Sequence, residues 1–571
     1  MQRVVLGINC SGFHSSACLL GPDGQVRFAI AEERLSRVKQ DKSFPRRAIE
    51  YCCAAAGLTP AEVTDVFIGW NPVGYLPQSG QTLADAFQNR GKLAQLSLQE
   101  LAAVQGADAR QLVQELLGAD GRRTRLHYVD HHRAHMANAL LPSGFAEADF
   151  FVADGFGETT TGLVGTATRA GDIRELAANR TPHSLGLFYA AFTDFLGFRP
   201  NGDEWKIMAL AARGDWRVYY ERLRPLITVE GLHYELDLRY FEFFLFFTPR
   251  YFSPKLEALL GPPLPAGAPP TQREYDIVAA VQRITEEVVF ELLRNLRART
   301  GQRRLVLGGG VLMNSVLNGK LWAQTGYEEI FIGATPDDTG ISVGSALYGH
   351  HFVLHEPAAP LAASRHNFFG REYAEAEIEA ELQRRKLRYE RPQDLTAAAA
   401  ALLHEGLVLG WFQGASELGQ RALGHRSILA DPTRPDMKQR VNASIKYREA
   451  FRPFAPAVPA EEQHRFFDLP AGETAYFMEK VYPLRPEAQR RLPAVTHDDG
   501  TGRLQTVVAA DNPAFHALLR AFGQLSSVPV LLNTSFNLNG MPLVESPADA
   551  LDCYLQSGLD ALVLGPFLLR K

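Results

Sequence analysis

Strand-like apolar runs alternate with helix-like segments through the first 340 residues, and this alternation limits the fold more than any other feature. Residues 4–8, 17–20 and 26–31 are apolar runs separated by glycine-containing turns, as expected of short strands. A long helix is expected at residues 273–297, where apolar side chains recur every three or four positions. Chains with this alternation pack as layers of helices and sheets. We therefore expect an α/β fold.

The length of the chain points to more than one domain. A chain of 571 residues exceeds what a single hydrophobic core supports. Residues 357–364 are small, apolar and marked by proline, which indicates a connection between domains. We expect one domain at residues 1–356 and a second at 365–571. Further elements are expected as strands at 63–70, 125–129, 150–153, 305–307, 330–333 and 528–532, and as helices at 46–56 and 133–140.

Composition excludes several classes of function. Hydrophobic residues make up 46% and charged residues 22%, which is the balance of a folded globular protein. A net charge of −5 gives no support to nucleic-acid or anionic-membrane partners. The five cysteines form no CxxC pair, and the N-terminal residues lack the apolar core of a signal peptide. We expect a cytoplasmic protein that binds neither nucleic acid nor membrane.

Two histidines and two aspartates have the pattern of a metal site. His131 and His135 are four residues apart, so a helix places both imidazoles on one face. Asp154 and Asp338 each follow an expected strand, and ligands gather at the carboxyl ends of strands in α/β sheets. These residue types suit a divalent metal. The alternative for the histidines alone is a set of solvated or capping side chains at a helix start.

Glycine-containing turns follow three of the expected strands, at residues 12–16, 155–158 and 308–314. The backbone N–H groups of such turns can approach phosphate oxygens closely because no Cβ intervenes. The chain contains neither the GxxxxGK[ST] P-loop nor GxGxxG. A nucleotide would therefore bind in a different fold, and turns without a ligand are the alternative.

A basic segment lies in the expected second domain. Residues 421–452 contain eight lysines and arginines against three acids. Arg421, Arg426 and Arg452 stand among small and apolar neighbours, and a charge in such surroundings usually has a partner. Arginine and lysine are the side chains that hold phosphate. The sequence NTSFN at residues 533–537 follows an expected strand and adds hydroxyls and amides. Solvated side chains remain the better interpretation for Arg434, Lys438 and Arg440.

With these motifs the chain resembles the antibiotic and nodulation-factor O-carbamoyltransferases. The matching stretches occur in order along nearly the whole chain. They are HxxxH at 131–135, VADGFGE at 152–158, GGGVLMN at 308–314, PDDTG at 336–340, SELGQRALGHRSILADP at 416–432, NASIKYREAFRPFAPAV at 442–458, HDDGTGRLQTV at 497–507 and NTSFN at 533–537.

The resemblance implies an enzyme with two domains. The N-terminal domain would have the Kae1-like fold of actin-like ATPases (ASKHA) and bind a divalent metal, Fe²⁺ in many relatives, with Mg²⁺ or Mn²⁺ as alternatives. The C-terminal domain would be YrdC-like α/β and form carbamoyl-adenylate from ATP and carbamoyl phosphate. The carbamoyl group would then pass to a hydroxyl of a small natural product or sugar, as in antibiotic biosynthesis.

The resemblance also implies roles for individual residues. The metal ligands would be His131, His135, Asp154 and Asp338. The catalytic set would be His14, Lys39, Arg421, Arg426, Lys446, Arg452 and Arg503, with His14 and Lys39 near the transfer site and His14 as our hypothesis for the base. Residues that bind ATP or carbamoyl phosphate would include Gly12, Gly309, Gly310, Asn314, Ser427, Asn533, Thr534 and Ser535.

Three other functions fit the sequence less well. A threonylcarbamoyl-type tRNA modification enzyme needs a basic RNA-binding surface, and the net charge of −5 argues against it. A hydrogenase-maturation carbamoyltransferase would carry CxxC pairs, which are missing. A non-enzymatic actin-like scaffold would leave the basic segment unexplained. The aromatic stretch at 240–252 is interpreted as core, with an acceptor cleft as the alternative. The sequence specifies neither the acceptor nor the oligomeric state, for which a homodimer is one option.

Overall fold

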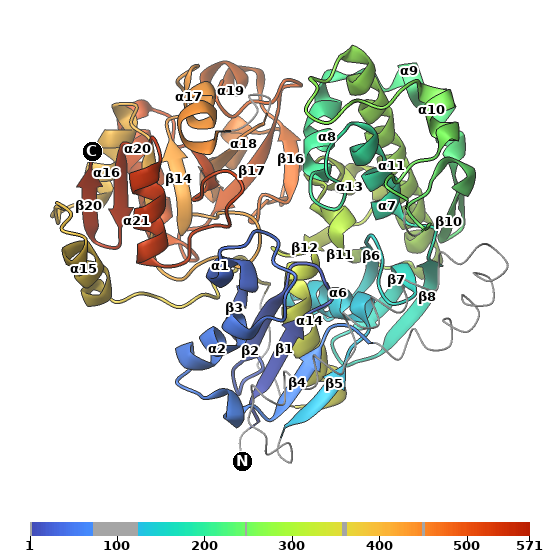
Figure 1. The fold of residues 1–571 in the computed structure, drawn as a ribbon, viewed down its shortest axis with the longest axis horizontal. Coiled ribbons are helices and arrows are strands. Elements are labelled where there is room, and N and C mark those ends of the chain that lie inside the picture. The colour runs from blue at the N-terminus through green and yellow to red at the C-terminus, as the bar shows by residue number, and fades with distance from the viewer. Residues whose placement is uncertain (1–2, 72–123, 246–247, 357–362, 448–451) are drawn as a thin grey trace. The chain divides into compact units, whose positions relative to one another are not determined.

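The computed structural model describes residues 3–71, 124–245, 248–356, 363–447 and 452–571 (Figure 1). The chain divides into two compact units. The first unit comprises Met1–Glu32 and Lys42–Ser364, and the second comprises Glu33–Asp41 and Arg365–Lys571. Both units combine sheets with helices, which confirms the expected α/β class.

The first sheet of the first unit has the strand order β3-β2-β1-β4-β5. β1, β2 and β3 form an antiparallel meander, whereas β4 and β5 run parallel to β1. The strands predicted near the N-terminus are therefore confirmed. The strands are β1 (Val5–Asn9), β2 (Ser16–Leu20), β3 (Val26–Ala31), β4 (Asp65–Ile68) and β5 (Arg125–Tyr128).

The second sheet has the order β12-β11-β6-β7-β8, in which β6, β11 and β12 are parallel. β7 and β8 extend this sheet as antiparallel strands on the other side of β6. The strands are β6 (Glu147–Ala153), β7 (Thr160–Thr168), β8 (Ile173–Arg180), β11 (Arg304–Gly308) and β12 (Glu329–Ile332).

Two helices pack face to face between these sheets (Figure 1). α6 (His131–Leu140) lies on β6 and β11, and α14 (Ile341–Tyr348) lies on β1 and β2. Their crossing needs glycine at residue 344, because a Cβ there would lie 1.9 Å from the carbonyl oxygen of Ala134. Each sheet is thus covered by one helix of the pair, and the two helices form the centre of the unit.

The rest of the first unit is mainly helical. Its longest helix, α11 (Gln272–Thr300), starts at a capping box of Thr271 and Glu274 and ends at Gly301. The helix predicted at 273–297 is therefore confirmed. The other elements are α2 (Arg46–Ala55), α7 (Leu185–Phe195), α8 (Glu204–Leu210), α9 (Arg217–Leu223), β9 (Ile227–Glu230), β10 (His233–Leu236), α10 (Pro254–Leu260), α12 (Ser315–Asn318) and α13 (Leu321–Thr325).

The aromatic stretch at 240–252 contributes to the core at both ends. Phe241 and Phe252 are buried and form an isolated β-bridge with each other. Phe241 also packs edge-on against Phe188 and Phe192 of α7. The core interpretation therefore holds for these two residues, while residues 246–247 lie outside the described part of the chain.

The second unit contains one sheet of eight strands in the order β16-β17-β15-β18-β14-β13-β19-β20. β13 and β19 are parallel, as are β15 and β17, and the other neighbours are antiparallel. The strands are β13 (Leu409–Phe412), β14 (Arg426–Ala430), β15 (Ala455–Pro459), β16 (Lys480–Pro483), β17 (Thr501–Val507), β18 (Leu531–Ser535), β19 (Ala561–Leu564) and β20 (Phe567–Arg570).

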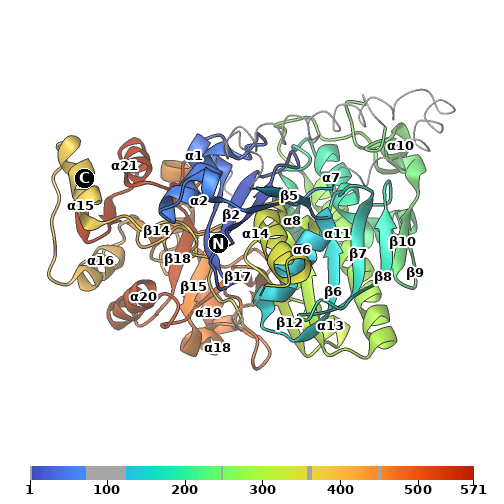
Figure 2. The same ribbon diagram turned by 90° about the horizontal axis from the view of Figure 1, so that it is seen from below.

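The central strands of this sheet are buried on both faces. Successive side chains of a strand point to opposite faces, so Ile428 and Leu429 of β14 belong to two different cores. One core includes α16 (Leu395–His404) and α20 (Pro513–Ser526), and the other includes α15 (Glu375–Arg384) and α21 (Pro547–Gln556). Figure 2 shows these pairs on opposite sides of the sheet. Three shorter helices are α17 (Met437–Val441), α18 (Gln463–Phe466) and α19 (Pro486–Arg491).

One segment of the N-terminal sequence belongs to the second unit, which differs from the domain range expected for residues 1–356. Glu33–Asp41, which includes most of α1 (Glu32–Ser36), groups with the C-terminal residues. The guanidinium of Arg37 donates to the carbonyls of Leu543 (2.8 Å) and Pro542 (3.1 Å). Lys39 is therefore part of the second unit.

Among the helices described, none is long and apolar enough to cross a membrane.

Candidate functional site

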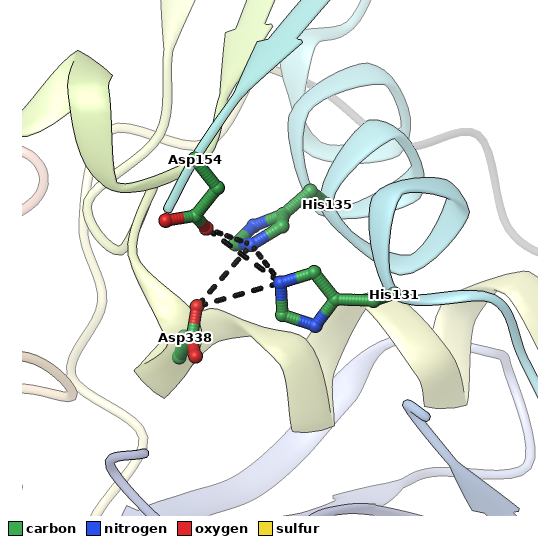
Figure 3. Close-up of side chains that lie close together, drawn as sticks. All are labelled: His131, His135, Asp154 and Asp338. Atoms are coloured by element: carbon green, nitrogen blue, oxygen red, sulfur yellow. Dashed lines mark hydrogen bonds and ion pairs between the residues drawn. The ribbon is translucent and has the colours of Figure 1, made fainter. Parts of the chain in front are cut away.

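Four side chains predicted as metal ligands converge in the first unit (Figure 3). The Nε2 atoms of His131 and His135 are 3.2 Å apart. An Asp154 carboxylate oxygen lies 2.9 Å from His135 Nε2 and 3.6 Å from His131 Nε2. An Asp338 oxygen lies 3.4 Å from His135 Nε2 and 3.6 Å from His131 Nε2. The four groups thus face a common point.

Three elements bring these ligands together. His131 and His135 occupy the first turns of α6 and point the same way, as their four-residue spacing predicts. Asp154 follows the last residue of β6, and Asp338 begins the short turn Asp338–Gly340 that leads into α14. The packing of α6 on both β6 and α14 therefore determines the geometry of the cluster.

The N-terminus of α6 is held by Glu158, which sequence reasoning did not assign. Its carboxylate accepts hydrogen bonds from the backbone N–H of His131 (3.0 and 3.2 Å) and of Asn71 (2.6 Å). A carboxylate at a helix N-terminus satisfies free N–H groups and complements the helix dipole. In the sequence, the feature that could have identified Glu158 is its position as the acid that ends the motif VADGFGE at 152–158.

Glycines 309 and 310 leave room for Asp154. A Cβ on Gly309, whose φ is +91°, would lie 2.1 Å from the carbonyl oxygen of Ala153. A Cβ on Gly310 would lie 2.9 Å from an Asp154 carboxylate oxygen. Close packing against the end of β6 thus requires Gly309, whereas a Cβ at residue 310 would displace the Asp154 carboxylate. The role of both glycines in nucleotide binding stays a prediction. The Asn314 side chain caps α12 and pairs with Gln282.

The cluster suits a divalent cation in charge and in spacing. With both imidazoles deprotonated, as metal ligation requires, two imidazoles and two carboxylates carry a charge of −2, which a divalent ion neutralises. Ligand atoms in a tetrahedral site with bonds of about 2.0–2.2 Å lie about 3.3–3.6 Å apart. The spacings of 2.9 to 3.6 Å between the imidazole and carboxylate atoms are close to this range. Both imidazoles are completely buried, so water competes little for the ion.

Electrostatics within the cluster favour a cation. Burial lowers the pKa of His135, but the hydrogen bonds and charges of Asp154 and Asp338 outweigh burial and raise this pKa to about 9. Burial raises the pKa of Asp154, but both histidines outweigh it and hold this pKa well below its usual range. The Asp154 carboxylate therefore stays ionised at neutral pH and holds a positive charge beside it.

His132 is buried next to the cluster but is oriented elsewhere. Its Nδ1 is 2.7 Å from the hydroxyl of Thr160. Burial, and then the neighbouring His131 and His135, keep the pKa of His132 well below 6.5, so its ring is neutral. The structure thus separates the cluster histidines from their immediate neighbour, which the sequence HHRAH alone does not.

The turn that carries His14 is tied to the loop before α14. His14 Nδ1 lies 3.0 Å from a carboxylate oxygen of Asp337, the residue before the ligand Asp338. Buried Asn9, at the end of β1, donates to the carbonyls of Phe13 (2.7 Å), His14 (3.2 Å) and Asp338 (2.9 Å). Neither Asn9 nor Asp337 was predicted as a site residue. Gly12 has a φ of +88°, and no atom lies within 4 Å of a Cβ built there.

Lys446 and Ser535 are brought together in the second unit. The buried Lys446 ammonium donates to the Ser535 hydroxyl (3.2 Å), to the Asn537 carbonyl (3.0 Å) and to the Asn537 side-chain oxygen (2.7 Å). It also donates to the Ser535 carbonyl. Asn537 was part of the quoted NTSFN motif but had no predicted role.

Strand register gathers the other predicted residues at one edge of the sheet. Ser427, at the start of β14, pairs with Ser535 at the end of β18. The start of β15, which follows Arg452, pairs with the same end of β18. β17 runs parallel to β15, so Arg503 near its start lies toward this edge. Thr534 and Asn533 occupy the neighbouring positions of β18.

Arg426 differs from the other arginines of this edge. Its guanidinium donates to the backbone carbonyls of Gln413 (2.7 Å), Gly414 (3.0 Å) and Glu545 (3.3 Å). It also lies 3.6 Å above the ring of Phe412 and is fully buried. These contacts use Nε and Nη1, whereas Nη2 is buried without a hydrogen-bond partner among the described residues. The role of Arg426 in binding carbamoyl phosphate or ATP stays a prediction.

Ser427 and Asn533 contact the loop that carries Arg421. The Ser427 hydroxyl accepts from the backbone N–H of Gly424 (3.0 Å). The Asn533 amide donates to the carbonyl of Ala422 (3.1 Å) and to the Gln505 side chain (2.7 Å). These side chains therefore shape the loop around Arg421.

Comparison with known proteins extends these observations over the whole chain. Family models described as the carbamoyltransferase N-terminus and C-terminus match residues 4–347 and 400–571. An uncharacterised protein of Synechocystis is 34% identical over 99% of this chain and 96% of its own length. Nodulation protein NolNO of Sinorhizobium fredii is 36% identical over 98% of this chain and 79% of its own length.

A relative whose name states an activity covers less of the chain. A 3'-hydroxymethylcephem-O-carbamoyltransferase of Amycolatopsis lactamdurans is 34% identical over 46% of this chain and 48% of its own length. A solved structure of full-length HypF covers 63% of this chain and 57% of its own at 14% identity and a TM-score of 0.32, which is too distant to support an argument. The two family models, which together match most of the sequence, show that this chain belongs to the carbamoyltransferase family and is a carbamoyltransferase.

Proposed function

We propose that this enzyme forms carbamoyl-adenylate from carbamoyl phosphate and ATP in its second unit and transfers the carbamoyl group to a hydroxyl of a small molecule in its first unit. The group of Lys446, Ser535 and Asn537 is the observation that carries the proposal. It lies at the edge of the sheet where β14, β15 and β17 begin and β18 ends. The name of the cephem relative, whose acceptor is a hydroxymethyl group, supports a small-molecule hydroxyl acceptor.

The first reaction consumes one molecule of water. Carbamoyl phosphate and water give carbamate and phosphate, and a carbamate oxygen then displaces pyrophosphate from the α-phosphorus of ATP. Both partners of the second step are anions, so cations must offset their repulsion. Lys446, Arg421, Arg452 and Arg503 would supply this charge, and Ser535 and Thr534 would donate hydrogen bonds to phosphate oxygens. Arg426, whose Nη2 has no hydrogen-bond partner among the described residues, would add a further cation at this edge.

Removing one cation from the second unit tests this assignment. Arg421→Ala should lower ATP-dependent pyrophosphate release with carbamoyl phosphate, measured without any acceptor, by at least about 100-fold, because one phosphate contact is lost at the reacting centre. His131→Ala should leave this release unchanged, because His131 belongs to the first unit. Release that stays at the wild-type rate in Arg421→Ala, or that is triggered by bicarbonate and not by carbamoyl phosphate, would contradict the proposal.

The transfer step belongs to the first unit in this proposal. His131, His135, Asp154 and Asp338 would hold a divalent metal, such as Fe²⁺, Mg²⁺ or Mn²⁺, that supplies a Lewis acid for the carbonyl or phosphate of the adenylate. Glu158 would keep the two histidines in place by holding the start of α6. The glycine turns at Gly12, Gly309 and Gly310 would accommodate the nucleotide.

His14 would accept the proton of the acceptor hydroxyl as the carbamoyl group is transferred and AMP leaves. Asp337 contacts Nδ1 of this ring, so an Nδ1–H donated to Asp337 leaves the Nε2 lone pair available as the base. The bonds of Asn9 to the His14 and Asp338 carbonyls would keep the base at a constant position relative to the metal ligands.

Metal binding can be measured without turnover. Wild-type protein should bind one Mn²⁺ or Fe²⁺ per chain, and Asp154→Asn and His135→Ala should each weaken this affinity by at least about 100-fold in calorimetric titrations. Because the pKa of His135 is about 9 in the metal-free protein, binding should displace a proton at neutral pH, and affinity should rise from pH 6 toward pH 9.

The control for this titration is His127→Asn, which changes a histidine of the same unit that pairs with Asp65. Its affinity for the metal should equal that of wild type. Unchanged affinity in both Asp154→Asn and His135→Ala would exclude the cluster as the metal site.

The role of His14 is tested separately from adenylate formation. His14→Asn should lower carbamoyl transfer to a hydroxymethyl acceptor by about 10²–10⁴-fold, as expected for loss of a general base, while pyrophosphate release without acceptor is unchanged. The acidic limb of the pH–rate profile for transfer, which reflects protonation of the base at low pH, should also disappear. Full transfer activity in His14→Asn would show that another group takes the proton.

A further inference from the structure

The loop that carries Arg421 is held by a buried carboxylate. We define the Arg421 loop as residues 417–426. One oxygen of Glu417 accepts hydrogen bonds from the backbone N–H groups of Leu423 (2.7 Å), His425 (2.9 Å) and Arg426 (3.2 Å). The Glu417 side chain is only 2% exposed, so these three bonds form in a region of low dielectric constant, where they are strong. The closing half of the loop is thereby fastened to its first residue.

The opening half of the loop is held from a distant part of the sequence. The guanidinium of Arg34, 385 residues earlier, donates to the carbonyl of Gly419. Arg34 is 2% exposed and lies in the segment Glu33–Asp41, which belongs to the second unit. Gly419 and Gly424 have φ values of +94° and +105°, so the loop bends at a glycine on each side of Arg421.

Arg34 is held in the electrostatic field of nearby carboxylates. Burial lowers its pKa, and Glu33, Glu545 and Glu417 counteract burial by stabilising the charge. A buried guanidinium without these neighbouring carboxylates would destabilise the folded protein, so the carboxylates favour this one position of Arg34. Among the described residues its Nε and Nη1 have no hydrogen-bond partner, so most of its directed bonding goes to Gly419.

Arg37 in the same segment has different contacts. It donates to the carbonyls of Leu543, Pro542 and Arg34 (3.3 Å) and lies 3.6 Å from Asp549, outside the Arg421 loop. Both arginines attach the segment to the second unit, but in the described part of the chain only Arg34 contacts the loop. The two side chains therefore form a matched pair in which one contacts the loop and the other serves as a control.

We propose that Arg34 and Glu417 are positioning residues that hold the Arg421 loop in the conformation needed for the reaction of carbamoyl phosphate with ATP. This inference rests on the proposed function, because Arg421 is assigned there to phosphate binding. Arg34 and Glu417 act through the loop and need not touch the substrates. A change in either residue should therefore matter only as far as Arg421 itself contributes.

A double-mutant cycle measures this dependence. Arg34→Lys and Arg421→Lys should each lower kcat/KM for carbamoyl phosphate in ATP-dependent pyrophosphate release by at least about tenfold, since lysine lacks the planar fork of arginine. The double variant should be no worse than Arg421→Lys alone. Arg37→Lys, the control, should combine with Arg421→Lys so that the two factors multiply.

Thermal unfolding of every variant is measured alongside, and Glu417→Gln replaces Arg34→Lys if the latter does not fold. The inference is wrong if the losses in kcat/KM of Arg34→Lys and Arg421→Lys multiply in the double variant. It is also wrong if Arg34→Lys and Glu417→Gln both have wild-type kinetics. In either case, pyrophosphate release by the wild-type protein still supports the proposed function. Wild-type protein that releases no pyrophosphate would overturn the proposed function and this inference with it.

Discussion

The close crossing of α6 and α14 is the constraint on which the candidate metal centre depends. Gly344 lets the two helices approach until backbone meets backbone at Ala134. The same approach carries His131 and His135 on one helix to Asp338, which precedes the other. The Asn138 side chain of α6 reinforces it by donating to the carbonyl of Thr335 at 2.7 Å. A bulkier residue at 344 would separate the ligands without altering any of them.

The second unit contains cationic side chains that are buried inside the folded protein. Lys446 is buried at the edge of the sheet but is bonded to oxygens of Ser535 and Asn537. Arg426 is buried nearby and satisfied mainly by backbone carbonyls. Buried charges are retained only where such partners exist. In our account the anionic substrates complete the set of partners at this edge.

Local patterns in the sequence predicted much of the fold and of the first site. The four-residue spacing of His131 and His135 and the strand-end position of Asp154 depend on helix and strand periodicity, which is readable within short windows. The membership of Arg34 in the second unit depends on a contact across 385 residues, which no local pattern encodes. Arg426 was grouped with phosphate-binding arginines because its neighbours are apolar. Only the structure shows that its Nε and Nη1 donate to backbone carbonyls while its Nη2 has no partner among the described residues.

The central claim is that carbamoyl transfer passes through a nucleotide-linked intermediate made in the second unit. The most direct measurement incubates the wild-type enzyme with isotopically labelled carbamoyl phosphate and ATP, without acceptor, and identifies the labelled species by mass spectrometry after rapid quenching. The account predicts labelled carbamoyl-adenylate in the wild type and in His131→Ala. Labelled carbamoyl phosphate that remains unreacted in the presence of ATP would contradict it. Label that reaches an added hydroxyl acceptor without ATP would also contradict it.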